Sequence, residues 1–301
     1  MENSLEYALV EDAPPGPDFL TSLKARFSAA APQVLERADQ TLDQVSHILS
    51  FSRDERTILN QGFLAYYLLF VETALELRGA PLLSTADSAV LQLLALIHWR
   101  SVDALHDADS LDLDSNRHRE LAALASAYIR ARAEGLGIDW VGGPGQHYRA
   151  FQTEVRRPRS SETLPTKDLT ETFLRDHFEH EPGTRGSFLF FIPTHVLRVI
   201  EADLAWYRFY TFVITLDDDL DDVLADAIAG RSTPTVRYLT SLGAFDPGKA
   251  RRFPKYYRFL TTFLIHQLDL CMQIAIREQF KAAYINLLVL RDFTQQKLQE
   301  V

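Results

Sequence analysis

The sequence predicts an all-α protein folded as a single large helical bundle. Apolar residues recur at three- and four-residue spacing along most of the chain, which is the period of an amphipathic helix. Glycine and proline are sparse, with 13 of each in 301 residues, and they are clustered. No alternating run typical of a β-strand stands out. We therefore expect one α-helical domain over residues 18–301, preceded by an irregular, proline-marked tail over residues 1–17.

Two long helices are expected in the first half of the chain. Residues 59–79, "LNQGFLAYYLLFVETALELRG", are helical in pattern, with Gly79 as the stop signal and Pro81 just beyond it. A second helix is expected over residues 85–112, capped by one of three polar residues at its start: Ser84, Thr85 or Asp87. The glycine-rich segment 135–166 interrupts the helical pattern and predicts a loop.

The second half of the chain predicts two or three further long helices. Residues 193–230 have the pattern of one very long helix or two abutting ones, ended by Gly230 and Pro234. Residues 247–293 supply one or two more. The segment "GTRGSFLFFIP", 183–193, has two glycines before a run of aromatics, and it could break a helix inside the bundle and aim backbone dipoles inward.

Composition excludes several classes of protein. The net charge of −10 disfavours binding to nucleic acid or to an anionic membrane surface. The single cysteine, Cys271, rules out an intrachain disulfide and fits a core position in a reducing compartment. The longest apolar stretch, "VLQLLALIHW", is too short to span a bilayer, and the acidic start lacks the features of a signal peptide. We expect a soluble, cytoplasmic protein without a membrane span; the oligomeric state is left open, a homodimer included.

An unusual run of aspartates begins at residue 217, beside apolar residues that belong to a core. On a helix, residues 217 and 221 point away from the others and are expected to face solvent. Like charges three and four residues apart repel each other, unless a divalent cation lies among them, and Mg²⁺ prefers such oxygen ligands. An exposed acidic helix face explains this stretch alone equally well. Four carboxylates fall within an arc of roughly 100°: Asp218, Asp219, Asp222 and Asp226.

A second acidic pair makes a metal site the better interpretation. Asp103 and Asp107 are four residues apart, late in a strongly apolar helix. Two D-x-x-x-D pairs on long apolar helices can face each other across a bundle, which is how metal sites in helical bundles are built. The two pairs together predict a divalent-cation site.

These segments resemble the class I isoprenoid synthases, a superfamily that includes terpene cyclases, trans-prenyl diphosphate synthases and squalene/phytoene synthases. "RSVDALHD" resembles the first D-x-x-x-D segment of the squalene/phytoene branch, carried by Asp103 and Asp107. "DVLADAIAGRSTP" resembles the second motif, in which an acidic helix ends in a Gly-Arg or Gly-Lys turn and a proline. Its matching residues are Asp222, Asp226, Gly230, Arg231 and Pro234.

The resemblance implies a helical bundle with a central apolar cavity, in which three Mg²⁺ ions hold the diphosphate of a prenyl substrate between the two acidic clusters. Departure of pyrophosphate leaves an allylic cation, and metals with basic residues stabilise the leaving group without proton transfer. Arg231 and Arg185 are the expected catalytic contacts. Further substrate-binding residues are expected among basic side chains and among aromatics that shield a cation: Arg100, Lys255, Arg258, Trp99, Phe188, Phe191, Trp206 and Tyr210.

Cyclisation or elimination is expected rather than chain elongation, because no Gly-Gly-Lys-Arg segment for a second, isopentenyl substrate is found near the N-terminus. A prenyl transferase, either chain-elongating or of the squalene/phytoene type, is the first alternative. A second is a catalytically inactive bundle that serves as a partner subunit. A third is an HD-type metal phosphohydrolase, suggested by the adjacent His106 and Asp107.

Overall fold

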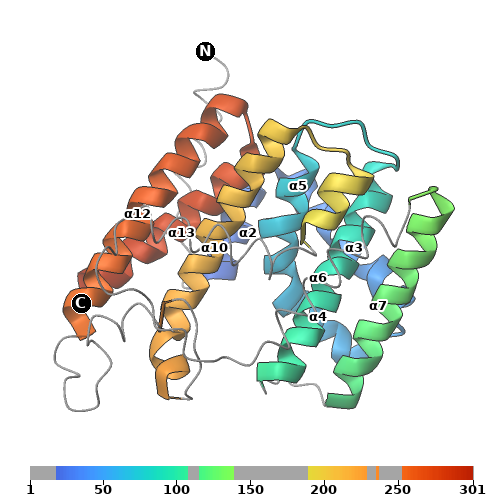
Figure 1. Ribbon diagram of the computed structural model, residues 1–301, viewed down its shortest axis with the longest axis horizontal. Coiled ribbons are helices and arrows are strands. Elements are labelled where there is room, and N and C mark those ends of the chain that lie inside the picture. Colours follow the sequence, from blue (N-terminus) through green and yellow to red (C-terminus); the bar gives the residue numbers. More distant parts are fainter. Residues whose placement is uncertain (1–17, 108–114, 139–188, 229–234, 237–252, 301) are drawn as a thin grey trace.

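The computed structural model describes residues 18–107, 115–138, 189–228, 235–236 and 253–300 (Figure 1). These ranges are almost entirely helical, with no β-strand among them, so the all-α prediction is confirmed for this part of the chain. Residues 1–17, expected to form an irregular tail, lie outside the described residues. The elements are α2 (Phe19–Ala30), α3 (Pro32–Ile48), α4 (Arg53–Tyr66), the π-helical η1 (Tyr67–Glu72), α5 (Thr73–Leu75), α6 (Thr85–Asp107), α7 (Ser115–Gly135), the π-helical η3 (Ile192–Val196), α10 (Glu201–Ile228), α12 (Phe253–Glu278) and α13 (Lys281–Glu300).

Polar side chains set the starts of α4 and α6. The Ser52 hydroxyl accepts from the backbone N–H of Glu55 at 3.2 Å, and the Glu55 carboxylate accepts from the N–H of Ser52 at 2.7 Å. This reciprocal capping box starts α4 at Arg53, earlier than the apolar pattern indicates. Of the three cap residues expected for α6, Ser84 is the one used, since its hydroxyl accepts from the N–H of Asp87 at 3.1 Å.

Between α4 and α5, the wider π-helix η1 leaves main-chain carbonyls available to neighbouring helices. Three buried side chains donate to them. Tyr207 and Tyr210 of α10 donate their hydroxyls to the carbonyls of Phe70 at 3.1 Å and Leu69 at 2.7 Å. Asn286 of α13 donates its amide to the carbonyl of Leu68 at 2.8 Å and to the Tyr210 hydroxyl at 3.0 Å. This polar network fixes η1 against α10 and α13 inside an otherwise apolar core.

Replacing Tyr210 with phenylalanine should lower the free energy of unfolding by about 1–2 kcal/mol. The ring still fills its site, but the buried carbonyl of Leu69 loses its donor, and a buried unpaired polar group costs about that much. Urea unfolding followed by circular dichroism should show a lower midpoint at an unchanged slope. Tyr128→Phe, at a half-buried position on α7, is the matched control and should stay within about 0.5 kcal/mol of the wild type.

The helix predicted over residues 193–230 is broken near its start. η3 ends at Val196, Arg198 adopts a left-handed backbone conformation with φ of 50°, and α10 begins at Glu201. Gly79, predicted to close the preceding helix, pairs instead with Val199 in an antiparallel β-bridge. The N–H of Ile200 donates to the carbonyl of Arg78 at 2.9 Å. Of the two alternatives expected for residues 193–230, one unbroken helix is wrong, and two successive helical segments are found, η3 and α10. The break lies between them because two interhelical segments cross here and exchange backbone hydrogen bonds.

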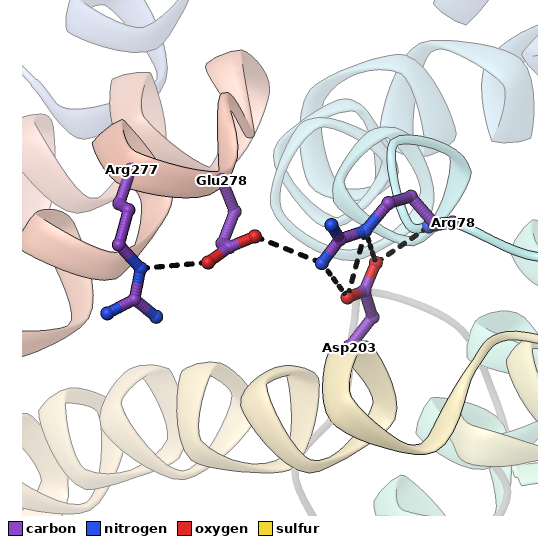
Figure 2. Close-up of polar contacts among 4 residues, drawn as sticks. All are labelled: Arg78, Asp203, Arg277 and Glu278. Carbon is purple, nitrogen blue, oxygen red and sulfur yellow. Dashed lines mark hydrogen bonds and ion pairs between the residues drawn. The ribbon is translucent and has the colours of Figure 1, made fainter.

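An ion-pair chain locks this crossing to the ends of two helices. Figure 2 shows Arg78 between Asp203, in the first turn of α10, and Glu278, at the end of α12. Asp203 is only 2% exposed and accepts from the backbone N–H of Arg78 at 2.8 Å and from its guanidinium at 2.5 Å. The Asp203 and Glu278 carboxylates raise the pKa of Arg78. The link holds the segment after α5 against the start of α10 and the end of α12.

The helices pack into one bundle around a contiguous apolar core. α6 packs along α7, α12 along α13, and α10 contacts both α12 and α13 (Figure 1). Cys271 of α12 is fully buried, as expected for a core residue, and burial raises the pKa of its thiol. The segment Tyr257–Glu278 of α12 is long and apolar enough to cross a membrane, but half of its most apolar window is buried in the bundle. A core helix of a soluble protein has the same character, so this segment is weak support for a span.

Candidate functional site

Each of the two acidic segments lies toward the C-terminal end of its helix. Asp103 and Asp107 lie in the last turns of α6, and the aspartate run that starts at Asp217 lies in the last third of α10. The two helices run in the same direction, and both end at the lower edge of Figure 1. Both aspartate pairs therefore belong to the same end of the bundle, as a shared cation site requires.

Side chains of α13 bind one face of the α10 aspartate run. The Lys297 ammonium lies 2.5 Å from Asp221 and 3.3 Å from Asp217, and the Thr294 hydroxyl donates to Asp217 at 3.2 Å. Asp217 is 13% exposed, so the prediction that it faces solvent is wrong: α13 packs against that face. Burial raises the pKa of Asp217, and the Lys297 ammonium opposes this. Asp221 is half-exposed but ion-paired.

The remaining aspartates of the run differ in burial. Asp218 and Asp222, four residues apart, are exposed. Asp219 is buried, with 9% of its surface exposed, on the side of α10 that also buries Leu216, Leu220 and Val223. The run thus divides into a face paired with α13, an exposed face and one carboxylate at the edge of the core.

The side chains of the other three expected metal ligands, Asp103, Asp107 and Asp226, lie outside the described residues, although their backbones belong to α6 and α10. Among the side chains that are described, no group of three or more histidine, cysteine, aspartate or glutamate residues is arranged to hold a metal ion. Asp218 and Asp222 offer only carboxylate oxygens, a donor set that suits Mg²⁺. The metal site stays a prediction built on the helix ends.

The basic residues expected to bind the diphosphate are only partly described. Arg185 and Arg231 lie outside the described residues. Lys255 is in the first turn of α12, but its side chain is also outside them. Arg100, one turn before Asp103 on α6, is half-buried. Arg258 is exposed on α12. Of the two side chains that are described, Arg100 is the one whose place on α6 fits a role near the acidic helix end.

The expected aromatic residues pack within the core. Phe191 and Tyr210 are fully buried, and Trp206 is 6% exposed with its ring 4.6 Å from Phe280, centroid to centroid. The Tyr210 hydroxyl is committed to the carbonyl of Leu69. Trp99 is half-buried on α6, and Phe188 lies outside the described residues. The three buried rings act as packing residues in this part of the structure, and a central cavity lined by them stays a prediction.

The residues missed by sequence reasoning are Thr294 and Lys297 of α13. They are three residues apart and therefore share a face of their helix, as Asp217 and Asp221 share a face of α10. Complementary charge at helical spacing was the available signal. It could not be used without knowing that α13 packs against α10.

Comparisons of the chain with models of known protein families, with curated proteins and with solved structures found no match.

Proposed function

We propose that the protein is a Mg²⁺-dependent, class I terpene synthase-like enzyme that ionises an allylic prenyl diphosphate and then cyclises the cation or eliminates a proton. The observation that supports this most is the parallel course of α6 and α10, which brings two D-x-x-x-D pairs to the same end of one helical bundle (Figure 1). Paired carboxylates on two helices are a means of holding cations that in turn bind a diphosphate.

In this proposal each acidic helix has its own part. Asp103 and Asp107 of α6, with Asp218, Asp222 and Asp226 of α10, hold the cations. Bound Mg²⁺ supplies the charge stabilisation that allows the diphosphate to leave. Arg231 and Arg185 bind the departing phosphate oxygens through charge-assisted hydrogen bonds.

In this proposal the apolar parts of α6 and α10 exclude water from the reacting cation. Before their acidic ends, α6 and α10 carry buried aliphatic side chains such as Leu96 and Val213. A site at this position is walled by groups that cannot add to a carbocation and that exclude water. Such walls favour ring closure or proton loss over capture by solvent.

The direct test is incubation with geranyl, farnesyl and geranylgeranyl diphosphates, in Mg²⁺ and in EDTA, followed by gas chromatography and a pyrophosphate assay. We expect Mg²⁺-dependent release of pyrophosphate with one preferred substrate, together with a hydrocarbon or alcohol product. A longer prenyl diphosphate formed only when isopentenyl diphosphate is added would establish a prenyl transferase instead. Absence of pyrophosphate and of product from every substrate, in protein that is folded by circular dichroism, would refute the proposal.

A further inference from the structure

A second candidate binding site lies at the other end of α6 from the aspartates. A cavity of about 290 Å³ is formed where the start of α3, the η1–α5 segment and the N-termini of α6 and α13 meet. Thr85, which lines it, is the first residue of the 23-residue α6, and Asp107 is the last. At 1.5 Å per residue, roughly 30 Å of helix separates the two places. The cavity is lined by Ala31, Gln33, Val34, Arg37, Glu72, Leu75, Glu76, Thr85, Lys281 and Ala282.

The two carboxyl groups in this cavity have different partners. Glu72 is 4% exposed, forms an ion pair with Arg37, and accepts from the Tyr67 hydroxyl at 3.3 Å. Glu76, one turn later, accepts from the backbone N–H groups of Ala282 at 2.7 Å and Ala283 at 3.4 Å, at the start of α13. Within the described ranges, Glu76 forms no ion pair with a lysine, arginine or histidine side chain. Glu76 is thus a cavity-lining carboxyl group without a cationic partner.

We propose that this cavity binds a small molecule carrying a primary ammonium group, which pairs with the Glu76 carboxylate. A carboxylate offers about four lone-pair sites, and the two backbone amides occupy only part of that capacity. An ammonium group supplies both the missing charge and further N–H donors in a charge-assisted bond. The inference does not depend on the proposed reaction with prenyl diphosphates.

The rest of the lining limits the size and chemistry of the ligand. Ala31, Val34 and Leu75 present apolar surface for a short carbon chain. Gln33 adds a polar amide that can donate to a carboxylate. The volume is at the lower end of small-molecule sites, so the ligand is of the size of an amine, a diamine or an amino acid. The amine, the diamine and the amino acid all carry an ammonium group, and the calorimetry below distinguishes among them.

Protonation of Glu76 gives the proposal a second readout. Burial, with a further contribution from Glu72, raises the pKa of Glu76 to about 8, whereas Arg37 is already paired with Glu72. The facing groups are Arg37 from α3, Glu72 from η1 and Lys281 from α13, while α6 contributes the uncharged Thr85. At pH 7 a group with that pKa is protonated in roughly nine molecules out of ten. Pairing with an ammonium ionises it, so binding should release close to one proton to the buffer.

Isothermal titration calorimetry at pH 7 tests this with butylamine, putrescine and norvaline. Butyrate, which lacks the ammonium group, and choline, which lacks N–H donors, serve as negative probes. Titrations in phosphate and in Tris, whose ionisation enthalpies differ, count the protons released. We expect saturable binding of at least one ammonium probe with close to one proton released, and none for butyrate or choline. Norvaline binding more tightly than butylamine indicates an amino acid ligand, and putrescine binding most tightly indicates a diamine.

Glu76→Gln should weaken that binding at least tenfold and abolish proton release. The glutamine carbonyl can still accept from the N–H of Ala282, so the cap of α13 is kept. Glu134→Gln is the matched control, because Glu134 is an exposed surface residue paired with Arg130. Equal binding by the wild type and Glu76→Gln overturns the proposal, as does the absence of saturable binding by every ammonium probe. If Glu76→Gln does not fold, the wild-type probe series decides, and butyrate or choline binding as tightly as the ammonium probes overturns the proposal.

Without ligand, Glu76 should also make stability depend on pH. Its folded pKa of about 8 lies above the 4.5 of an unperturbed glutamate, so between these pH values the folded state binds the extra proton. The wild type should therefore lose stability relative to Glu76→Gln as the pH rises from about 4.5 through 8. Thermal melts of both proteins across this range measure the difference. Parallel curves would contradict the raised pKa.

Discussion

Replacing Gly79 with alanine is expected to lower the free energy of unfolding by about 3 kcal/mol, near the upper end for overpacking a tight site. A Cβ at this position would lie 2.4 Å from the carbonyl oxygen of Leu197 and 2.9 Å from that of Arg198. Both obstacles are backbone atoms, so no side chain can rotate away. The β-bridge to Val199 must open to make room, and the N–H of Ile200 then loses its short bond to the carbonyl of Arg78. Urea unfolding followed by circular dichroism measures the loss.

Gly62→Ala is the matched control and should have the opposite sign. Gly62 lies inside α4, and nothing comes within 4 Å of a Cβ built there. Alanine is favoured over glycine in a helix interior by about 1 kcal/mol, so this variant should be stabilised by about that amount. If Gly79→Ala were neutral or stabilising, the tight crossing of the two interhelical segments would be incorrect.

The pattern of apolar residues predicts the long helices because helix formation and burial follow from local spacing. The end of α6 and the apolar length of α10 fall within the ranges expected from the sequence. The π-helix η1 was not predicted, because its residues Tyr67–Glu72 continue the apolar run of α4 without any interruption. The sequence left a break in residues 193–230 open but did not place it before α10, for a different reason. The backbone bonds at this break go to Arg78 and Ala80, which are distant in sequence, so no local signal marks it.

The acidic site is also predictable only in part, because contacts between residues distant in sequence leave no local signal. The spacing of the aspartates identifies the helix faces that carry charge, and both pairs lie at the ends of helices that run in the same direction. Which of those faces meets another helix depends on packing. Asp217 has a solvent-facing pattern in the sequence, yet α13 covers it with Thr294 and Lys297. The spacing of residues along one helix does not show which other helix packs against each of its faces.

Because the aspartate run has one exposed face and one face paired with α13, substitutions on the two faces can distinguish metal binding from packing. Asp222→Asn should reduce the rate of Mg²⁺-dependent pyrophosphate release by about 100-fold, the size of effect expected when one charge-stabilising group is lost. Asp222 is exposed on α10, four residues from Asp218, so its loss should leave the fold intact. Thermal unfolding in EDTA should be close to that of the wild type, because removing one exposed carboxylate from a like-charged run relieves repulsion.

Asp221→Asn is the neighbouring substitution with the opposite expectation. Asp221 pairs with Lys297 at 2.5 Å and is directed toward α13, away from the face that carries Asp218 and Asp222. Its loss should reduce stability by up to about 1 kcal/mol, since Asp221 is half-exposed and Lys297 keeps its contact with Asp217 at 3.3 Å. Pyrophosphate release should stay within a few-fold of the wild type.

Equal losses of activity in both variants would mean that the run acts only through its total negative charge. A loss confined to Asp221→Asn would place the cation site on the face toward α13, with Lys297 as the residue that occupies it in the absence of metal.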